Sequence, residues 1–291
     1  MNKSVQSFMR KRTDYKVTMI LFFIFFLVMS FLFVYPLVWA FFNSLKSAGE
    51  FFENSFSLPK EWMFTNYVKV FTDFRYKDYY YFEMLFNSLW MLVLRVSVNV
   101  MSSAFLAYAV SRYRFPGKEL IYVLVIFANT IPIVGSGAAS YKLLSAFKMI
   151  DNPLLIWLAW AGGFDFAFIV FYGAFKGISM SYSESAKIDG AGNFRILFKI
   201  IFPQAFPCII AIAITQAVGI WNDFYTVMIY MRAYPNLAYG LYVFSSESNW
   251  VENSKPIYLA AVTISVIPVI VLYASNQKLI LTNVTAGGLK G

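Results

Sequence analysis

The 291-residue chain contains no histidine, a single cysteine and few charged residues, which make up 13% of it. The absence of histidine removes the side chain that most often serves as general base, haem ligand or zinc ligand. One cysteine, Cys208, excludes a disulfide within the chain and is typical of a small buried thiol. A phosphate-binding loop of the form G-x-x-x-x-G-K-[ST] is missing too. These absences predict a chain that is not an enzyme and has no metal or cofactor of its own.

Apolar residues dominate instead. Hydrophobic residues amount to 59% of the chain and its mean hydropathy is +0.61, far from an ordinary soluble domain. Because a transmembrane helix needs about 20 mostly apolar residues, the sequence predicts an all-α integral membrane protein with six transmembrane helices. The predicted spans are residues 17–42, 84–110, 120–141, 153–175, 206–230 and 256–275. The first is too long for a cleaved signal peptide and is expected to remain as an anchor.

The distribution of Lys and Arg predicts the orientation, since positively charged loops stay on the cytoplasmic side. With the N-terminus inside, the inner segments carry fourteen of these residues and the outer segments nine. Five of the nine lie in the long loop 43–83, where six acidic residues cancel them. Both termini and the loop between the fourth and fifth spans are therefore expected in the cytoplasm. The net charge of +9 follows mostly from this topology, and nucleic-acid binding is not expected.

The loop between the fourth and fifth spans is polar enough to lie outside the bilayer and is predicted to form two short helices around a glycine. Ser181 and Glu184 have the spacing of a capping box, and Gly190 can adopt the left-handed conformation that ends a helix. Asn193 is expected to cap the second helix and Pro203 to stop it. That helix is predicted to have one apolar face, made of Phe194, Leu197, Phe198 and Ile201.

The same loop resembles the EAA loop of ABC importer permeases, whose pattern is Glu-Ala-Ala, three residues, Gly, nine residues, Ile, one residue and Leu-Pro. The positions that keep this spacing are Glu184, Ala186, Gly190, Ile200 and Pro203. Two positions depart from it, with Ser185 for the second Ala and Phe202 for Leu. The resemblance implies a coupling helix that docks on a cytoplasmic ATPase through Glu184, Ala186, Asp189, Gly190, Phe194, Leu197 and Phe198. The alternative is a structural linker without a partner.

Polar residues within the apolar spans are costly and indicate a functional or a packing role. Arg95 and Asn99 lie one turn apart in the second span, and Asp165 lies midway along the fourth. For Arg95 and Asp165 we expect a charge pair or a contact with a partner chain that holds the bundle together, in preference to direct contact with a ligand.

The third span is interrupted. Asn129 and Thr130 precede Pro132, Gly135 and Gly137, which indicates a kinked or unwound helix that faces protein or a water-filled cavity. Polar atoms at bilayer depth need such partners, so Asn129 and Thr130 are candidates for lining a substrate pathway.

Trp221, Asn222 and Asp223 are the other pathway candidates. They lie about 27 Å of helix beyond Pro203, near the outer end of the fifth span. A Trp at that depth is also typical of an interfacial anchor. The neighbouring amide and carboxylate are groups that bond to sugar hydroxyls.

Further motifs make the resemblance more specific. They are Asn87-Ser88-Leu89, Ala107 to Arg112, Phe115-Pro116-Gly117, Trp221 to Phe224, Ile267-Pro268, Gln277-Lys278 and Thr285 to Gly291. Together they are similar to carbohydrate-uptake permeases of the maltose-type second-subunit family and cover most of the chain. The family implies the ABC type I importer permease fold, in a bacterial cell membrane.

The resemblance also implies partners. They are a homologous second permease subunit, a cytoplasmic ABC ATPase dimer that binds ATP and Mg, and an extracellular sugar-binding protein that delivers an oligosaccharide. The expected organisation is a cytoplasmic N-terminal segment (1–16), a first helix with its extracellular loop (17–83), a five-helix core containing the loop 181–203 (84–281) and a cytoplasmic tail (282–291). The alternatives are an ABC permease for an amino acid, peptide or polyamine, and a membrane scaffold or enzyme without a transport role.

Overall fold

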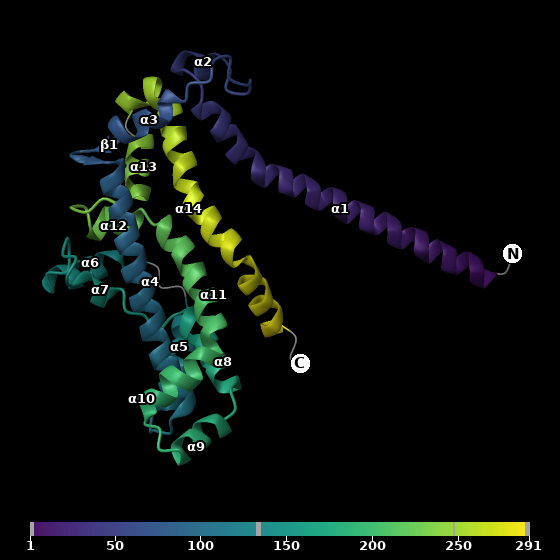
Figure 1. Ribbon diagram of the computed structural model, residues 1–291, viewed down its shortest axis with the longest axis vertical. Helices are drawn as coiled ribbons and strands as arrows, with labels where there is room; N and C mark the ends of the chain where they lie inside the picture. The colour runs from purple at the N-terminus through teal and green to yellow at the C-terminus, as the bar shows by residue number, and fades with distance from the viewer. Residues whose placement is uncertain (1–2, 132–134, 247, 289–291) are drawn as a thin grey trace. The chain divides into compact units, whose positions relative to one another are not determined.

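A computed structural model of the chain describes residues 3–131, 135–246 and 248–288. The chain forms two compact units, one made of residues 1–74 and 247–264 and the other of residues 75–246 and 265–291. Helices make up nearly all of the regular structure (Figure 1). The predicted all-α class is thus confirmed, with one two-residue pair of strands added.

The first unit contains α1 (Lys3–Ser44), α2 (Ala48–Glu53), α3 (Thr65–Thr72) and the beginning of α14 (Ser248–Gly288). An apolar stretch of α1, Tyr15–Ser44, is long enough to cross a membrane, which matches the first predicted span. Its side chains are apolar on every side rather than along one stripe, as in helices that lipid surrounds. The sixth predicted span corresponds to Lys255–Gln277 of α14.

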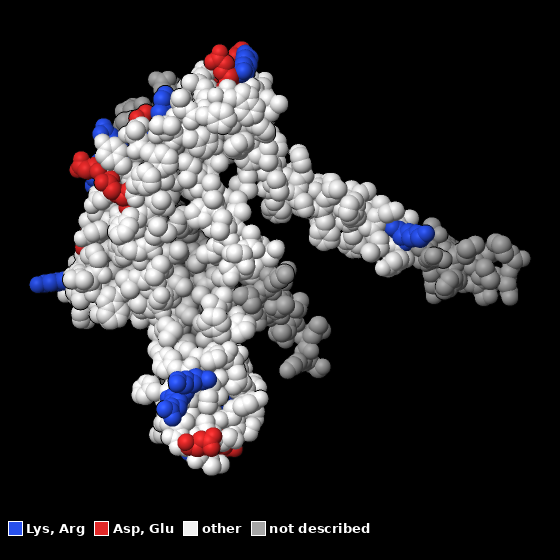
Figure 2. Space-filling view, in the orientation of Figure 1, with Lys and Arg blue, Asp and Glu red and all other residues white. Residues whose placement is uncertain are grey.

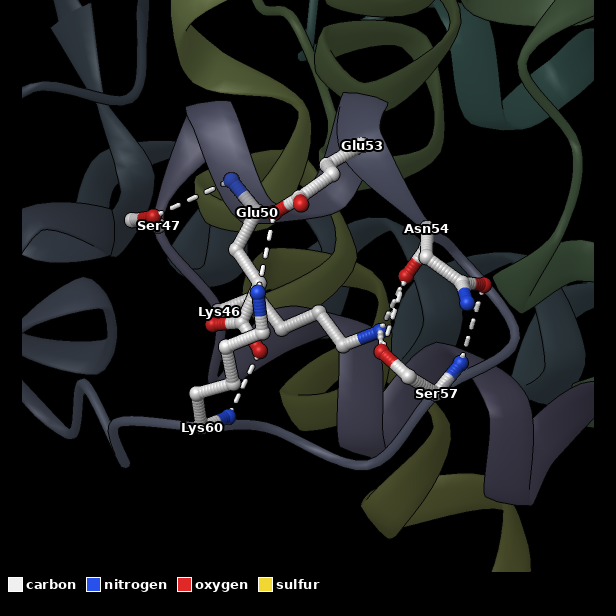
Figure 3. Close-up of polar contacts among 7 residues, drawn as sticks. All are labelled: Lys46, Ser47, Glu50, Glu53, Asn54, Ser57 and Lys60. Carbon is white, nitrogen blue, oxygen red and sulfur yellow. Dashed lines mark hydrogen bonds and ion pairs between the residues drawn. The ribbon is translucent and has the colours of Figure 1, made fainter.

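The loop after α1 folds around a buried lysine (Figure 3). Lys46 is fully buried, and its Nζ donates to the Asn54 carbonyl at 2.8 Å and to Ser57 Oγ at 3.3 Å. Burial lowers the pKa of Lys46, while the negative charge of Glu50 opposes that effect. The neighbouring Lys60 remains exposed and pairs with Glu53 at 3.0 Å, a hydrogen bond that raises the pKa of Lys60. Buried charge needs such partners, so the loop is a packed element.

The second unit is built around α4 (Tyr81–Arg112). Helices α8 (Phe166–Gly177) and α11 (Phe202–Trp221) pack along it, and α5 (Lys118–Thr130) and α13 (Leu237–Ser246) contact it as well (Figure 1). Small residues let α4 and α8 approach closely, since Ala104 and Ala107 of α4 share a buried cluster with phenylalanines of α8. A hairpin of β1 (Arg75–Tyr76) and β2 (Tyr79–Tyr80) precedes α4.

Shorter helices complete this unit. They are α6 (Gly137–Ala146), α7 (Ile156–Ala159), α9 (Ser181–Ile188), α10 (Asn193–Ile196), the π-helical turn η1 (Leu197–Ile201) and α12 (Tyr225–Tyr230).

The described residues contain four helices long and apolar enough to span a membrane, at Tyr15–Ser44, Tyr81–Arg112, Asn193–Trp221 and Lys255–Gln277. The third predicted span is divided into α5 and α6, with Gly135 at φ +89° between them. This agrees with the expected break, although Pro132 lies outside the described residues. The fourth span was predicted as one helix and is wrong in that respect, because Gly163 at φ +137° interrupts it and α8 starts anew at Phe166.

Candidate functional site

The polar loop between α8 and α11 forms the helical hairpin expected from the sequence, with different capping. Helix α9 begins at Ser181, but Met180 occupies the N-cap position without a side-chain bond. The predicted capping box of Ser181 and Glu184 is therefore wrong. Ser179 takes over part of that role, since its hydroxyl accepts from the Ser181 N–H at 3.3 Å. The preceding loop thus supplies the oxygen that the pattern assigned to Ser181.

Gly190 adopts the left-handed conformation that the sequence predicts, with φ +78°. Helix α9 ends at Ile188, and the Ala191 N–H donates to the Ala186 carbonyl at 2.8 Å across the bend. This six-to-one bond is typical of a Schellman motif, which requires a residue that tolerates positive φ. A Cβ at Gly190 would meet no atom within 4 Å, so backbone conformation alone favours glycine here.

The second half of the hairpin continues into the membrane helix without a stop. Asn193 is the first residue of α10 and Gly192 its N-cap, so the predicted Asn193 cap is wrong. Pro203 does not end the helix either, because it lies in the first turn of α11, where proline is tolerated. The π turn η1 joins α10 to α11. The second helix of the hairpin and the membrane helix α11 therefore form one continuous helix.

The π turn also divides the predicted apolar face. Leu197 and Ile201 are buried, whereas Phe194 is 79% exposed and Phe198 47% exposed. One half of the face packs inward, and the other half is left at the surface. Among the remaining predicted coupling residues, Ala186 is buried, while Glu184, Asp189 and Gly190 are exposed. Figure 2 shows basic and acidic side chains gathered close together where Figure 1 places α9 and α10.

Arg112 ties the hairpin to the core. Its guanidinium donates to the Ile178 carbonyl and contacts the Met180 sulfur, both at 2.8 Å, and so joins the end of α4 to the start of α9. An aromatic cluster adds a second link, because Phe105 of α4 stacks with Phe202 of α11 at 5.9 Å. In the sequence, Arg112 stands out only as the last residue of the motif Ala107 to Arg112. Its contact with Ile178 spans 66 residues, so no local sequence pattern predicts it.

Within the membrane region, Arg95 pairs with Asp223 at 2.6 Å. A charge pair or a contact with a partner chain was expected for Arg95 and Asp165; Arg95 does form a charge pair, and its partner is the predicted pathway residue Asp223. Asp165 instead caps α8, with its carboxylate accepting from the Phe168 N–H at 3.1 Å and from the Ser103 hydroxyl. Asp223 also accepts from the N–H of Thr226 at 3.0 Å, at the break between α11 and α12.

The other predicted pathway residues take no part in this ion pair. Trp221 is buried, and its indole N–H donates to the Ser265 carbonyl at 3.1 Å, so it packs inside the unit. Asn129, Thr130 and Asn222 are exposed, and each bonds to a carbonyl four residues earlier in its own helix. The expected continuous fifth span to residue 230 is wrong, since α11 ends at Trp221.

The polar contacts around Asp165 leave no room for a side chain at Gly162. A Cβ there would lie 2.5 Å from Asn99 Nδ2, 2.5 Å from Ser103 Oγ and 2.7 Å from Asp165 Oδ2. We expect Gly162→Ala to destabilise the packing by about 1–3 kcal/mol, the usual cost of overfilling a core. The measurement is the thermal unfolding of the purified protein in detergent.

Gly173→Ala provides the matched control, since a Cβ at this α8 position meets nothing within 4 Å. Alanine should be tolerated or slightly stabilising there because of its higher helix propensity. Equal unfolding temperatures for the two variants would contradict the steric account of Gly162.

Comparison with known proteins places this architecture in a family. Residues 4–284 match the model of the binding-protein-dependent transport system inner membrane component. The chain belongs to this family and is thus a permease subunit of an ABC transporter, which is not itself an enzyme. The resemblance inferred from the sequence is confirmed.

Individual relatives cover nearly the whole chain. The diacetylchitobiose uptake system permease protein NgcG of Streptomyces coelicolor is 29% identical over 87% of this chain and 83% of its own. The arabinooligosaccharides transport system permease protein AraQ of Bacillus subtilis is 27% identical over 97% of this chain and 100% of its own. The fold is similar to a bacterial ABC transporter involved in the import of the acidic polysaccharide alginate, with a TM-score of 0.78, 23% identity and coverage of 90% and 96%.

Proposed function

We propose that this chain is a transmembrane permease subunit of an ATP-driven importer for oligosaccharides. Membership of the permease family supports the transport role, and relatives named for diacetylchitobiose and arabinooligosaccharides support the substrate class. The protein forms the translocation pathway together with a second permease. A bacterial plasma membrane location accords with the inner-membrane family and the four long apolar helices.

The hairpin α9–α10 is the element through which an ATPase acts. Phe194 exposes a large apolar side chain to solvent, as residues that bind a partner protein do. Glu184 and Asp189 of the same hairpin are exposed too and carry negative charge. A partner chain binds ATP and Mg and closes around nucleotide, and the hairpin transmits that movement to α4 and α11. Gly190 sets the bend, while Ala186 and Leu197 pack beneath the contact surface. An extracellular binding protein delivers the sugar.

The substrate test is deletion of the gene in its native host, followed by uptake assays with labelled oligosaccharides, peptides and amino acids. Loss of oligosaccharide uptake alone, restored by a plasmid copy, is the expected result. Loss of peptide or amino-acid uptake with normal sugar uptake would assign a different substrate class. Alanine variants of Asn129, Thr130, Trp221, Asn222 and Asp223 then test the predicted pathway in the same assay.

Both termini and α9 lie on the cytoplasmic side and the loop 43–83 lies outside, because the segments that contain the termini and α9 carry the excess of Lys and Arg. We expect cysteines introduced at Glu61 and Ser185 in a Cys208→Ser background to react oppositely with a membrane-impermeant thiol reagent. Both positions are exposed, so accessibility depends on the side of the membrane. In intact cells only the residue-61 cysteine should react, and permeabilised cells serve as the control. Labelling of both in intact cells would contradict the topology.

A further inference from the structure

A polar cavity lies beside the Arg95–Asp223 pair. It has a volume of about 300 Å³ and is lined by Arg95, Asn99, Gln216, Gly219, Ile220 and Asp223. Arg95 is 17 residues from the end of α4 at Arg112, so it lies about 26 Å along a helix of about 48 Å. This position is near the middle of the membrane-spanning length. Polar groups at such depth face protein or water, and they frequently mark a substrate path.

The charges of the cavity cancel. The Asp223 carboxylate accepts from Arg95 at 2.6 Å and from the N–H and hydroxyl of Thr226, so its oxygens are occupied. The guanidinium has five N–H donors and also lies 5.9 Å from the Trp160 ring. The ion pair neutralises the charge of the guanidinium, while the N–H groups that do not bond to Asp223 can still donate hydrogen bonds to a ligand. An acidic ligand would have to displace Asp223 and leave that carboxylate unpaired, which is costly.

Two amides complete the lining. Gln216 Nε2 donates to Asn99 Oδ1 at 2.6 Å. This bond fixes the two side chains: Asn99 Nδ2 lies beside Gly162, Ser103 and Asp165, and Gln216 Oε1 is left as an acceptor that complements the N–H donors of Arg95. A sugar hydroxyl both donates and accepts a hydrogen bond. The pair therefore matches a neutral polyol better than a carboxylate, which only accepts.

We infer that this cavity is a contact site for a neutral saccharide, and that Arg95, Asn99 and Gln216 select against acidic ones. The inference rests on the proposed function and specifies its substrate class. The volume of the cavity is at the lower end of the range for ligand pockets, about 300–1,000 Å³, so the cavity holds a short part of an oligosaccharide at a time.

Gly219 offers a direct test, because a Cβ there meets no atom within 4 Å. In Gly219→Leu the new side chain should occupy the cavity while both hydrogen-bonded pairs remain. We expect the transport KM for the imported sugar to rise at least about tenfold, with normal membrane assembly. Gly173→Leu, on α8 and equally free of contacts, is the matched control and should transport like the unmodified protein.

A second variant removes polarity without adding bulk. Gln216→Met removes the amide that donates to Asn99 Oδ1 and keeps a side chain of similar length, while Asn99 stays in place beside Ser103 and Asp165. Uptake of the neutral sugar should fall by a similar factor. Thr215→Val is its control, since the Thr215 hydroxyl donates to the Ala211 carbonyl of its own helix.

Both variants are assayed in cells that contain the full importer, with labelled neutral oligomers of glucose, galactose, arabinose and N-acetylglucosamine and with oligouronates of equal length. Import of a neutral oligomer that both variants impair supports the inference. Preferred import of oligouronates, or normal transport by Gly219→Leu, would overturn it and leave the proposed function intact. If the unmodified importer takes up none of these saccharides, the proposed function itself fails, and this inference with it.

Discussion

Gly190→Val is expected to reduce sugar uptake by about tenfold or more while the transporter complex still assembles. The glycine has φ +78° at the bend between α9 and α10, a conformation that a β-branched residue adopts only with strain of about 1–3 kcal/mol. No neighbouring atom lies within 4 Å of the added Cβ, so the effect arises from the backbone and not from a clash. The strained bend redirects α9 relative to Phe194. Uptake and ATPase activity, measured together in reconstituted vesicles, report the coupling.

Gly190→Asn is the matched control, because asparagine tolerates the left-handed region much better than valine. It should retain most of the uptake. A Gly190→Val protein that couples like the unmodified one would show that the hairpin is a passive linker, and the proposed route from ATPase to membrane helices would be wrong.

The second large effect is expected for Phe194→Ala. This ring is 79% exposed, although the adjacent Ile196 and Leu197 are buried. A single aromatic anchor in a protein interface contributes about 2–4 kcal/mol, which corresponds to a loss of at least about thirtyfold in affinity. We therefore expect the variant to lose the ATPase subunit during purification in detergent, while the protein itself remains folded.

Phe166→Ala provides the comparison for that experiment. Phe166 is 66% exposed but begins α8, at the end of that helix remote from the hairpin. Its replacement should leave the ATPase bound. If Phe194→Ala retains the ATPase, this ring is not an anchor, and the acidic residues of α9 become the candidates for binding it.

The sequence predicts the hairpin because its signals are local. Glycine at a helix end and the apolar spacing around it depend on residues within one or two turns, and φ +78° at Gly190 confirms that prediction. The capping assignments fail at Ser181 and Asn193 by one residue each. The exact first residue of a helix depends on its neighbours, here the Ser179 hydroxyl before α9 and the extended Gly192 before α10, which spacing alone does not resolve.

Ion pairs between residues far apart in the sequence cannot be predicted from such local signals. Arg95 and Asp223 are 128 positions apart, and both Asp165 and Asp223 were available as partners by composition. Only the packing of α11 along α4 decides between them. The same holds for the fourth span, where hydropathy predicts one helix because it does not register that Gly163 takes positive φ. Hydropathy recognises apolar length, whereas backbone breaks depend on contacts made after folding.

The uninterrupted passage from α10 through η1 into α11 has a mechanical consequence. Helix α11 has 20 residues and is therefore about 30 Å long. As a stiff lever pivoting at the end that adjoins the hairpin, such a helix moves its far end by about 5 Å for a tilt of about 10°, close to one helical pitch. Asp223 lies just beyond that far end. A small angular displacement by the ATPase would thus be amplified into a stroke long enough to separate the paired carboxylate from a guanidinium carried on another helix.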